Sequence, residues 1–243
     1  DRNTRLRSAD QTVRLLFAER SSETEFSTSG RALSNSKTVE MRHLEDGIGY
    51  IAITNLDDPK LPGEVKKAVE SVRADQGVIL DLRGNQGGGD NDVARIMGMF
   101  VKPGTETGTI VAPGQTVTTK AEPADQTAQP IFPESKPVVV LVDRNTASSA
   151  ENLAGSLKES HRAVIVGEKT YGKSGIQIPR LLPGGTIALV VVADRGDLKG
   201  AIYTDVGINP DIAVEGASQG DRSSEDPAVR KGREILRKRK PGS

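Results

Sequence analysis

The chain has 243 residues, which is enough for one large domain or two small ones. Its 33 basic and 33 acidic residues balance, so no overall field favours nucleic acid or an anionic membrane as a partner. Cysteine is absent and histidine occurs twice, which excludes disulfides, thiolate nucleophiles and cysteine-ligated metals and nearly excludes a histidine-rich metal site. No apolar run approaches the roughly 20 residues that span a bilayer, so we expect no integral membrane segment.

The N-terminal segment predicts a small amount of β structure. Residues 1–10 are polar, and we expect them to be poorly ordered. Two strands are predicted at Thr12–Glu19 and Glu23–Arg31, joined by a short serine turn. A hairpin of this size is not stable alone, so it must pack on the remainder or be the end of a domain whose front half is absent.

Strands and helices then alternate. Strands are predicted at short apolar runs, and helices where apolar residues recur every three or four positions. Continuous apolar runs such as Val138–Val142 are typical of strands buried on both faces. In chain order the predicted elements are an extended stretch 37–44, strand 48–53, helix 61–74, strand 78–82, helix 91–100, strand 138–142, a helix opening at Ser148, and strand 163–166. This order predicts an α/β core.

Hairpins and a terminal helix are appended to this core. Pro183-Gly184-Gly185 is a clear turn signal, and the basic segment after Pro227 predicts a solvated helix. The predicted elements are strands 109–112, 116–120, 176–182, 186–192 and 201–204, a turn 207–211, a linker 217–226 and a helix 227–240. We therefore divide the chain into an N-terminal β segment (1–36), an α/β domain (37–216), and a linker with a C-terminal helix (217–243).

One sequence motif fits a phosphate-binding loop, but the residues that follow it do not predict the helix that such a loop needs. Gly167 to Ser174 (GEKTYGKS) fits G-x-x-x-x-G-K-[ST], the phosphate loop of nucleotide hydrolases. That loop needs a helix beginning at its Gly-Lys-Ser, because the helix amides hold the phosphates. Here the sequence GIQIPRLLPGG follows, and its β-branched residues and proline predict a strand. Residues 84–89 lack the G-x-G-x-x-G spacing of a dinucleotide site.

Ser148 and Lys173 each lie just past the end of a predicted parallel strand, so we expect them to meet at one sheet edge. A serine beside a lysine is a nucleophile–base pair. Each has a simpler explanation when taken alone, because Ser148 and Glu151 fit a helix capping box and most loop lysines are exposed.

Three features favour chemistry at this pair. A helix start gives Ser148 neighbouring backbone amides, and the Gly87-Gly88-Gly89 amides can approach a substrate carbonyl closely. Apolar side chains at 171, 176 and 178 are expected to enclose the lysine and favour its neutral form. A Ser-His-Asp arrangement is not predicted, because His161 would lie on the order of 20 Å away and His43 has no evident orienting partner.

Five segments, in this order along the chain, resemble a known family. They are IGYI (48–51), VILDLRGNQGG (78–88), TASSAE (146–151), GEKTYGK (167–173) and GINPD (207–211). Together they span roughly residues 37–215 and resemble the C-terminal processing, or tail-specific, proteases. The resemblance implies an α/β fold with a crotonase/ClpP-like core of stacked strand–helix units, appended β-hairpins, and an incomplete PDZ-like β segment in front.

The resemblance also implies roles for individual residues. It makes Ser148 the nucleophile, Lys173 the general base and Gln177 the residue that orients the lysine. Backbone amides of Gly87 or Gly88 and of Ser149 would form the oxyanion hole, so a serine at 149 where alanine is common should matter little. Glu151 would have a supporting, structural role.

The departure from the family lies at the front of the chain. Residues 10–32 resemble only the last strands of the PDZ domain that captures a substrate tail in this family, so the resemblance does not extend to tail selectivity. Some members of the wider group are exported, so we expect an extracytoplasmic location (periplasmic, secreted or lumenal) after removal of a targeting segment, with the cytoplasm as the alternative.

We therefore predict a serine endopeptidase of the C-terminal processing type, with 37–216 as its catalytic domain. It would cleave an extended segment of a protein or peptide that adds to a sheet edge, through an acyl-enzyme. No cofactor or metal is implied, and the oligomeric state is open. The alternatives are a non-catalytic binding module on the same fold, in which Ser148 is only a helix cap, and, less favoured, the nucleotide hydrolase.

Overall fold

The computed structural model describes most of the chain, namely residues 5–7, 12–16, 23–27, 38–89, 92–126, 128–182, 187–219 and 221–238. These residues form two compact units. The small unit comprises residues 1–37 and 176–193, and the large unit comprises residues 38–175 and 194–243. The N-terminal segment is thus grouped with most of the 176–192 hairpin, and the C-terminal segment is grouped with the α/β core. None of the helices in the described ranges is long and apolar enough to cross a bilayer.

The small unit contains an antiparallel sheet of three strands in the order β1-β2-β3. Strands β2 (Thr12–Leu16) and β3 (Glu23–Ser27) confirm the predicted pair, although both are shorter than expected. Strand β1 (Arg5–Arg7) was not predicted and lies within residues 1–10, which we expected to be poorly ordered; the other residues of that stretch lie outside the described ranges. The likeness of this segment to part of a PDZ domain stays a prediction.

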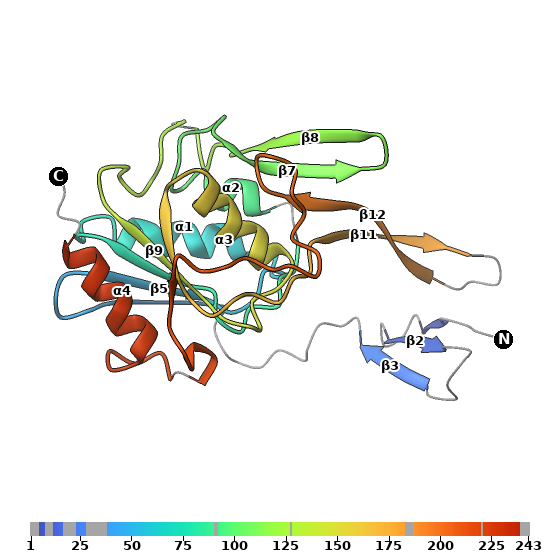
Figure 1. Cartoon of the computed structure of the whole chain (residues 1–243), viewed down its shortest axis with the longest axis horizontal. Coiled ribbons are helices and arrows are strands. Elements are labelled where there is room, and N and C mark those ends of the chain that lie inside the picture. The colour runs from blue at the N-terminus through green and yellow to red at the C-terminus, as the bar shows by residue number, and fades with distance from the viewer. Residues whose placement is uncertain are drawn as a thin grey trace. The chain divides into compact units, whose positions relative to one another are not determined.

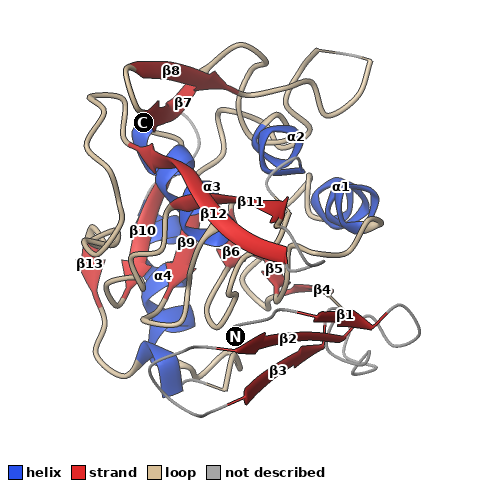
Figure 2. Ribbon diagram, turned by 90° about the vertical axis from the view of Figure 1, so that its right-hand side faces the viewer, coloured by secondary structure: helices blue, strands red, loops and turns tan. Residues whose placement is uncertain are grey.

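The large unit is built on a six-stranded sheet in the order β13-β10-β9-β6-β5-β4, which can be followed across Figure 2. All neighbouring strands are parallel except β4, which runs antiparallel to β5 at the edge. The strands are β4 (Val39–His43), β5 (Gly49–Ile53), β6 (Val78–Asp81), β9 (Val138–Val142), β10 (Ala163–Gly167) and β13 (Ile212–Ala213). This sheet confirms the predicted α/β core.

Helices cover both faces of this sheet (Figure 1). Alternate residues of β9 point to opposite faces, as the pleat requires. Val138, Val140 and Val142 pack in the cluster that contains residues of α1 (Leu61–Ser71), α2 (Val93–Met97) and α3 (Ser149–Glu159). Val139 and Leu141 pack in the cluster that contains residues of α4 (Pro227–Lys238).

The C-terminal helix is less solvated than predicted, because it docks through buried charges. Ala228, Val229 and Leu236 of α4 are buried. Asp226 accepts the N–H groups of Ala228 and Val229 at 2.8 and 3.1 Å and so caps the helix. Its carboxylate also accepts from Arg83 Nη1 at 2.9 Å, and both of these side chains are almost fully buried. The charged pair therefore ties α4 to the chain that follows β6.

The two predicted hairpins are β7 with β8 and β11 with β12, and in each the two strands are neighbours in a four-stranded sheet. Strand β7 (Glu106–Ala112) pairs with β8 (Gln115–Lys120), and residues Asp194–Gly196 of β12 (Ile187–Gly196) pair with β7. Strand β11 (Gly175–Leu181) begins directly after Ser174, as expected. A strand in this place leaves no helix to hold phosphates, so the nucleotide-hydrolase alternative was wrong.

The predicted last strand, Ala201–Thr204, was also wrong. Ile202 makes only an isolated bridge with Gly196. The last strand is β13, which joins the sheet because Asp211 exchanges hydrogen bonds with Ile165 of β10 through its main-chain N–H and its carboxylate, both at 2.8 Å. Two residues of strand are too few to leave a pattern in the sequence.

Candidate active site

Three loops leave the same edge of the central sheet. Strands β6, β9 and β10 are parallel neighbours, so the segments that follow them, residues 82–89, 143–148 and 168–174, start side by side. They carry the glycine run, Ser148 and Lys173, respectively. The strand order therefore places the starts of the three loops at one edge of the sheet, and the meeting of the Ser148 and Lys173 side chains stays a prediction.

Ser148 lies at a sharp turn between the β9 loop and α3. Its backbone has φ 56° and ψ −127°, an unfavourable conformation for a residue with a side chain. The turn is held where the N–H of Ala147 donates to the carbonyl of Asn85 at 2.9 Å. Strand, strained serine and helix in this order are typical of a turn that presents a nucleophile.

The carboxylate of Glu151 connects the serine turn to the lysine loop. Its Oε2 accepts the main-chain N–H of Ser148 at 3.1 Å and of Lys173 at 2.8 Å. Its Oε1 accepts the N–H of Gly172 at 2.7 Å and the hydroxyl of Thr170 at 2.5 Å. Glu151 is fully buried. The bond to Ser148 is the one that a capping box predicts, and the other three extend the same carboxylate to the lysine loop.

Thr170 was not singled out from the sequence. Besides its bond to Glu151, its hydroxyl accepts the N–H of Ile208 at 2.7 Å. The N–H of Tyr171 donates to the carbonyl of Thr146 at 3.0 Å. The lysine loop is thus bound both to the serine loop and to the GINPD turn, two segments that the resemblance had named separately.

The glycine loop contacts the serine turn directly. A Cβ on Gly87 would lie 2.7 Å from Cβ of Ser148 and 2.9 Å from the nitrogen of Ser149. The N–H of Gly87 donates to Asn85 Oδ1 at 2.9 Å. In the part of the chain that the structure describes, the N–H of Gly88 has no hydrogen-bond acceptor. Of the two glycines predicted for an oxyanion hole, this geometry favours Gly88.

Ser149 has a role that the sequence did not predict. We expected its side chain to matter little, but its hydroxyl donates to the carbonyl of Gly88 at 2.8 Å. This bond fixes the peptide after Gly88 to the residue that follows Ser148. The side chain therefore sets the spacing between the two proposed main-chain donors.

The surroundings of Lys173 differ from the prediction. Its side chain is exposed, and Tyr171, which was expected to help enclose it, is 67% exposed. Gln177 belongs to the small unit, so its contact with Lys173 stays a prediction.

The chain after Lys173 is held by polar side chains that no sequence pattern indicated. The hydroxyls of Ser174 and Thr204 are 2.6 Å apart, and Thr204 donates to Asp194 Oδ1 at 2.5 Å. The carbonyl of Ser174 accepts the N–H of Arg195 at 3.1 Å. These bonds fix the main chain on the C-terminal side of the lysine.

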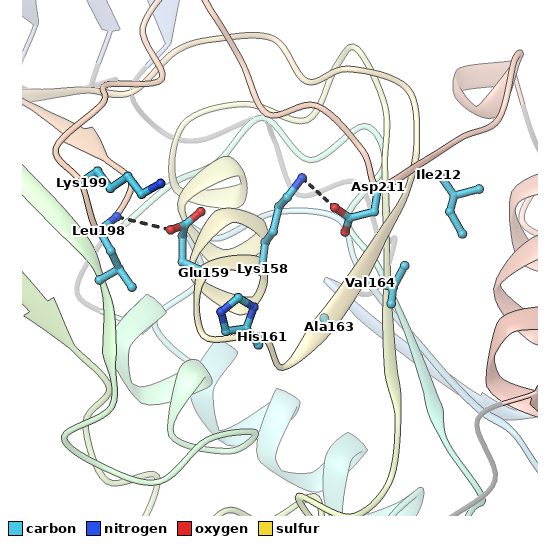
Figure 3. A pocket seen from close by; sticks show the side chains of 9 residues that line it. All are labelled: Lys158, Glu159, His161, Ala163, Val164, Leu198, Lys199, Asp211 and Ile212. Atoms are coloured by element: carbon cyan, nitrogen blue, oxygen red, sulfur yellow. Dashed lines mark hydrogen bonds and ion pairs between the residues drawn. The ribbon is translucent and has the colours of Figure 1, made fainter. Parts of the chain in front are cut away.

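A pocket of about 840 Å³ lies at the C-terminal end of α3, away from Ser148. Lys158 Nζ and Asp211 form an ion pair at 2.9 Å, and His161 lines the same pocket (Figure 3). This pocket follows the last turn of α3, on the order of 15 Å from Ser148 along the helix. His161 is therefore remote from Ser148, as predicted. Within the described ranges, no group of three or more His, Cys, Asp or Glu side chains is placed to hold a metal ion.

Comparison with known proteins adds independent evidence. The family model described as Peptidase family S41 matches residues 47–214. Carboxy-terminal processing protease CtpA of Bacillus subtilis is 30% identical over 182 residues, which are 74% of this chain and 37% of that protein. Carboxyl-terminal-processing peptidase 2, chloroplastic, of Arabidopsis thaliana is 32% identical over 166 residues, which are 68% of this chain and 31% of that protein. The chain spans about a third of the length of these relatives.

Solved structures share the fold. The photosystem II D1 C-terminal processing protease superposes with a TM-score of 0.63 at 23% identity, covering 90% of this chain and 62% of that one. A crystal structure described as a putative peptidase from Parabacteroides merdae superposes with a TM-score of 0.68 at 20% identity, covering 85% of this chain and 67% of that one. These likenesses confirm the predicted fold class.

Proposed function

Because the chain belongs to peptidase family S41, we propose that its large unit is the catalytic part of a serine endopeptidase that cleaves extended or C-terminal segments of protein substrates. The observation that carries this proposal is the shared acceptor Glu151 Oε2, which holds the main-chain N–H groups of both Ser148 and Lys173. A carboxylate in this position keeps a hydroxyl-bearing turn and an amine-bearing loop together. The names of the relatives, which include C-terminal processing proteases, support the same reaction.

The proposed reaction needs only groups of this chain and water. The neutral amine of Lys173 accepts the proton of the Ser148 hydroxyl while Oγ attacks the substrate carbonyl carbon. The N–H groups of Gly88 and Ser149 stabilise the resulting oxyanion. The amine leaves with the proton from Lys173, and an acyl-enzyme on Ser148 remains. Water, deprotonated by the same amine, then releases the acyl group, and Gln177 orients the lysine throughout.

The substrate and the compartment are part of the proposal. A protein segment would bind in an extended form and add to a sheet edge, with its scissile carbonyl over the glycine loop. We propose that the protein acts outside the cytoplasm, and relatives whose names include the word chloroplastic are consistent with an organelle or exported location.

Two alanine variants test the dyad. Ser148→Ala removes the attacking oxygen and Lys173→Ala removes the base, so each should lower peptidase kcat/KM by at least about 1,000-fold. Ser160→Ala, at the other end of α3, and Lys169→Ala, an exposed lysine of the same loop, are the matched controls and should retain activity. Cleavage of a casein or peptide mixture is measured by mass spectrometry, with thermal unfolding to check the fold. Activity of the Ser148→Ala variant at the wild-type rate would refute the proposal.

The exposed position of the Lys173 side chain keeps a non-catalytic binding module as a second candidate. In that case Ser148 is only the helix cap, the wild-type protein cleaves no peptide, and Ser148→Ala binds peptides as the wild type does. A covalent probe separates the two functions, because a fluorophosphonate phosphonylates only an activated serine, whose Oγ bonds to phosphorus as fluoride leaves. Intact mass analysis would report one adduct on an active wild-type protein and none on Ser148→Ala.

A further inference from the structure

Strand β4 is the outer strand of the six-stranded sheet and has one open edge. The N–H of Thr54, just after β5, donates to the carbonyl of Thr38, just before β4, at 3.0 Å. In an antiparallel pair the bonding side alternates along the strand, so the main-chain groups of Val39, Met41 and His43 face away from β5. Among the residues that the structure describes, these N–H and C=O groups have no hydrogen-bond partner.

The other edges of the two larger sheets carry features that oppose further pairing. Strand β13 has only two residues, and β11 contains Pro179, which has no N–H to donate. The register of β8 with β7 is shifted between Glu106 and Gly108. Strand β4 has five residues, no proline, and an unbroken register with β5. Its edge is therefore regular enough to receive another strand.

The edge of β4 is complementary to itself. A second copy that runs antiparallel, with Met41 opposite Met41, places Val39 of each copy opposite His43 of the other. These are the residues whose main-chain groups face outward, so each opposed pair can exchange both of its hydrogen bonds. No other antiparallel register centred on a residue of β4 matches all three outward-facing residues in this way.

The charges of β4 match in the same register. Glu40 of each copy then lies opposite Arg42 of the other, and opposite charges directly across two strands stabilise the pair. The Arg42 side chain is held in place, because its Cζ lies 3.7 Å from the centroid of the Tyr50 ring and its Nη2 donates to the carbonyl of Arg222. In the described ranges, neither Glu40 nor Arg42 has an ion-pair partner within its own chain. The apolar Met41, which is 39% exposed, would be covered by its own counterpart.

We propose that β4 binds a second copy of this chain, so that two six-stranded sheets join into one across a two-fold axis at Met41. An unrelated extended peptide could use the main-chain groups, but the matched charges favour the second copy. Because the two copies run antiparallel, their proposed active sites would open at opposite edges of the joined sheet. A five-residue edge buries less than the roughly 1,000 Å² of a stable interface, so the dimer should be weak, with a Kd on the order of 10–100 µM.

The test is sedimentation velocity on the full chain, from about 1 to 500 µM, which brackets the expected Kd. The wild-type protein should pass from monomer to dimer over this range. Glu40→Arg places two arginines opposite each other on both sides of the axis and should raise the Kd at least about 10-fold. Glu215→Arg, the same change at an exposed position beyond β13, is the matched control and should keep the wild-type Kd.

Two further variants check the register. Arg42→Glu alone should also weaken the dimer, but an equal mixture of Arg42→Glu with Glu40→Arg restores opposite charges at both positions and should form a heterodimer with about the wild-type Kd. Met41→Pro removes an N–H that faces away from β5, so it should fold and lose the dimer. It keeps the proposal falsifiable if Arg42→Glu, which loses the contact with Tyr50, does not fold, as judged by thermal unfolding.

Two results would overturn the proposal. A wild-type protein that stays monomeric over the whole range would show that the edge does not bind a second copy and leaves it for a different extended chain. A dimer whose Kd is unchanged in both Glu40→Arg and Met41→Pro would show that the copies meet elsewhere. Sedimentation involves no cleavage, so either result leaves the proposed peptidase function untouched.

Discussion

The main-chain N–H of Lys173 donates to the buried carboxylate of Glu151 at 2.8 Å. The same oxygen accepts the N–H of Ser148, so a shift of either loop is transmitted to the other through one side chain. Glu151 is thus a positioning residue for the proposed dyad rather than a helix cap alone.

Replacing Glu151 by Gln tests this role. The amide keeps one acceptor oxygen and turns an NH₂ group toward two of the donors, which leaves buried N–H or O–H groups unpaired at roughly 1–3 kcal/mol each. We expect the variant to fold with reduced stability and to lose about 100-fold in peptidase kcat, because the dyad is misplaced. Peptide hydrolysis and thermal unfolding measure the two effects. Glu159→Gln, the same change at the other end of α3, is the control and should retain activity.

Ser149→Ala tests the bond from its hydroxyl to the carbonyl of Gly88. Loss of one neutral hydrogen bond of this kind corresponds to about 0.5–1.5 kcal/mol, so kcat should fall about 2–10-fold while KM changes little. Steady-state kinetics on a single peptide measure kcat and KM separately. Ser160→Ala removes a hydroxyl from the far end of the helix and serves as control. Equal kcat values for Ser149→Ala and the wild type would show that the bond does not position the oxyanion donors.

Gly87→Ala tests the close contact between the glycine loop and the serine turn. Its φ of 93° is unfavourable for alanine, and the new Cβ would overlap Ser148 and the carbonyl of Ala147 at 2.7 and 2.9 Å. We expect activity to be lost. Gly104→Ala has a similar φ of 85° but meets no atom within 4 Å, so it pays only the backbone cost of roughly 1–2 kcal/mol and should stay active. Comparable activity in both variants would contradict the contact.

Asp226→Asn tests the charged pair that docks α4. Burial opposes ionisation of Asp226, but hydrogen bonds from Arg83 and from the α4 amides, with the charge of Arg83, hold its pKa below the ordinary range. A lowered folded-state pKa means that the ionised group adds stability above its unfolded pKa of about 3.9, and that this stability is lost as the pH falls through the folded pKa.

The stability difference between the wild type and Asp226→Asn should therefore be largest near pH 7, up to about 3 kcal/mol, and should shrink toward pH 3. Urea unfolding at a series of pH values measures it. Glu225→Gln, an exposed neighbour, should show a small difference at every pH. A difference for Asp226→Asn that stays constant with pH would contradict the role of the ion pair.

Short-range patterns predicted the central elements well. The run Val138–Val142 matches β9 residue for residue, because a strand buried on both faces must be apolar throughout. Ser148 was identified as the start of a helix because a serine followed by Glu151 is a local capping signal. The edge position of Ser148 and Lys173 followed from strand order alone, since parallel strands end together.

What the sequence did not predict are the bonds between segments. The hydroxyl of Thr170 donates to Glu151 and the side-chain amide of Asn85 donates to the carbonyl of Ile53, and nothing in their immediate neighbours distinguishes these two residues from solvent-facing ones. Arg83 and Asp226 form an ion pair although they are far apart in the chain. Because nothing near Asp226 in the sequence indicates this partner, residues 217–226 resembled a linker. Tyr171 was expected to help enclose Lys173, but in its loop the side chain is 67% exposed.

The strained backbone of Ser148 implies a conflict between the proposed activity and the stability of the fold. At φ 56° and ψ −127°, any side chain is strained, and glycine is the residue that relieves this strain. Ser148→Gly should therefore unfold at a higher temperature than Ser148→Ala, by the equivalent of about 1–3 kcal/mol, although both lack the hydroxyl. Replacing the proposed nucleophile by glycine would thus stabilise the protein at the expense of the proposed activity.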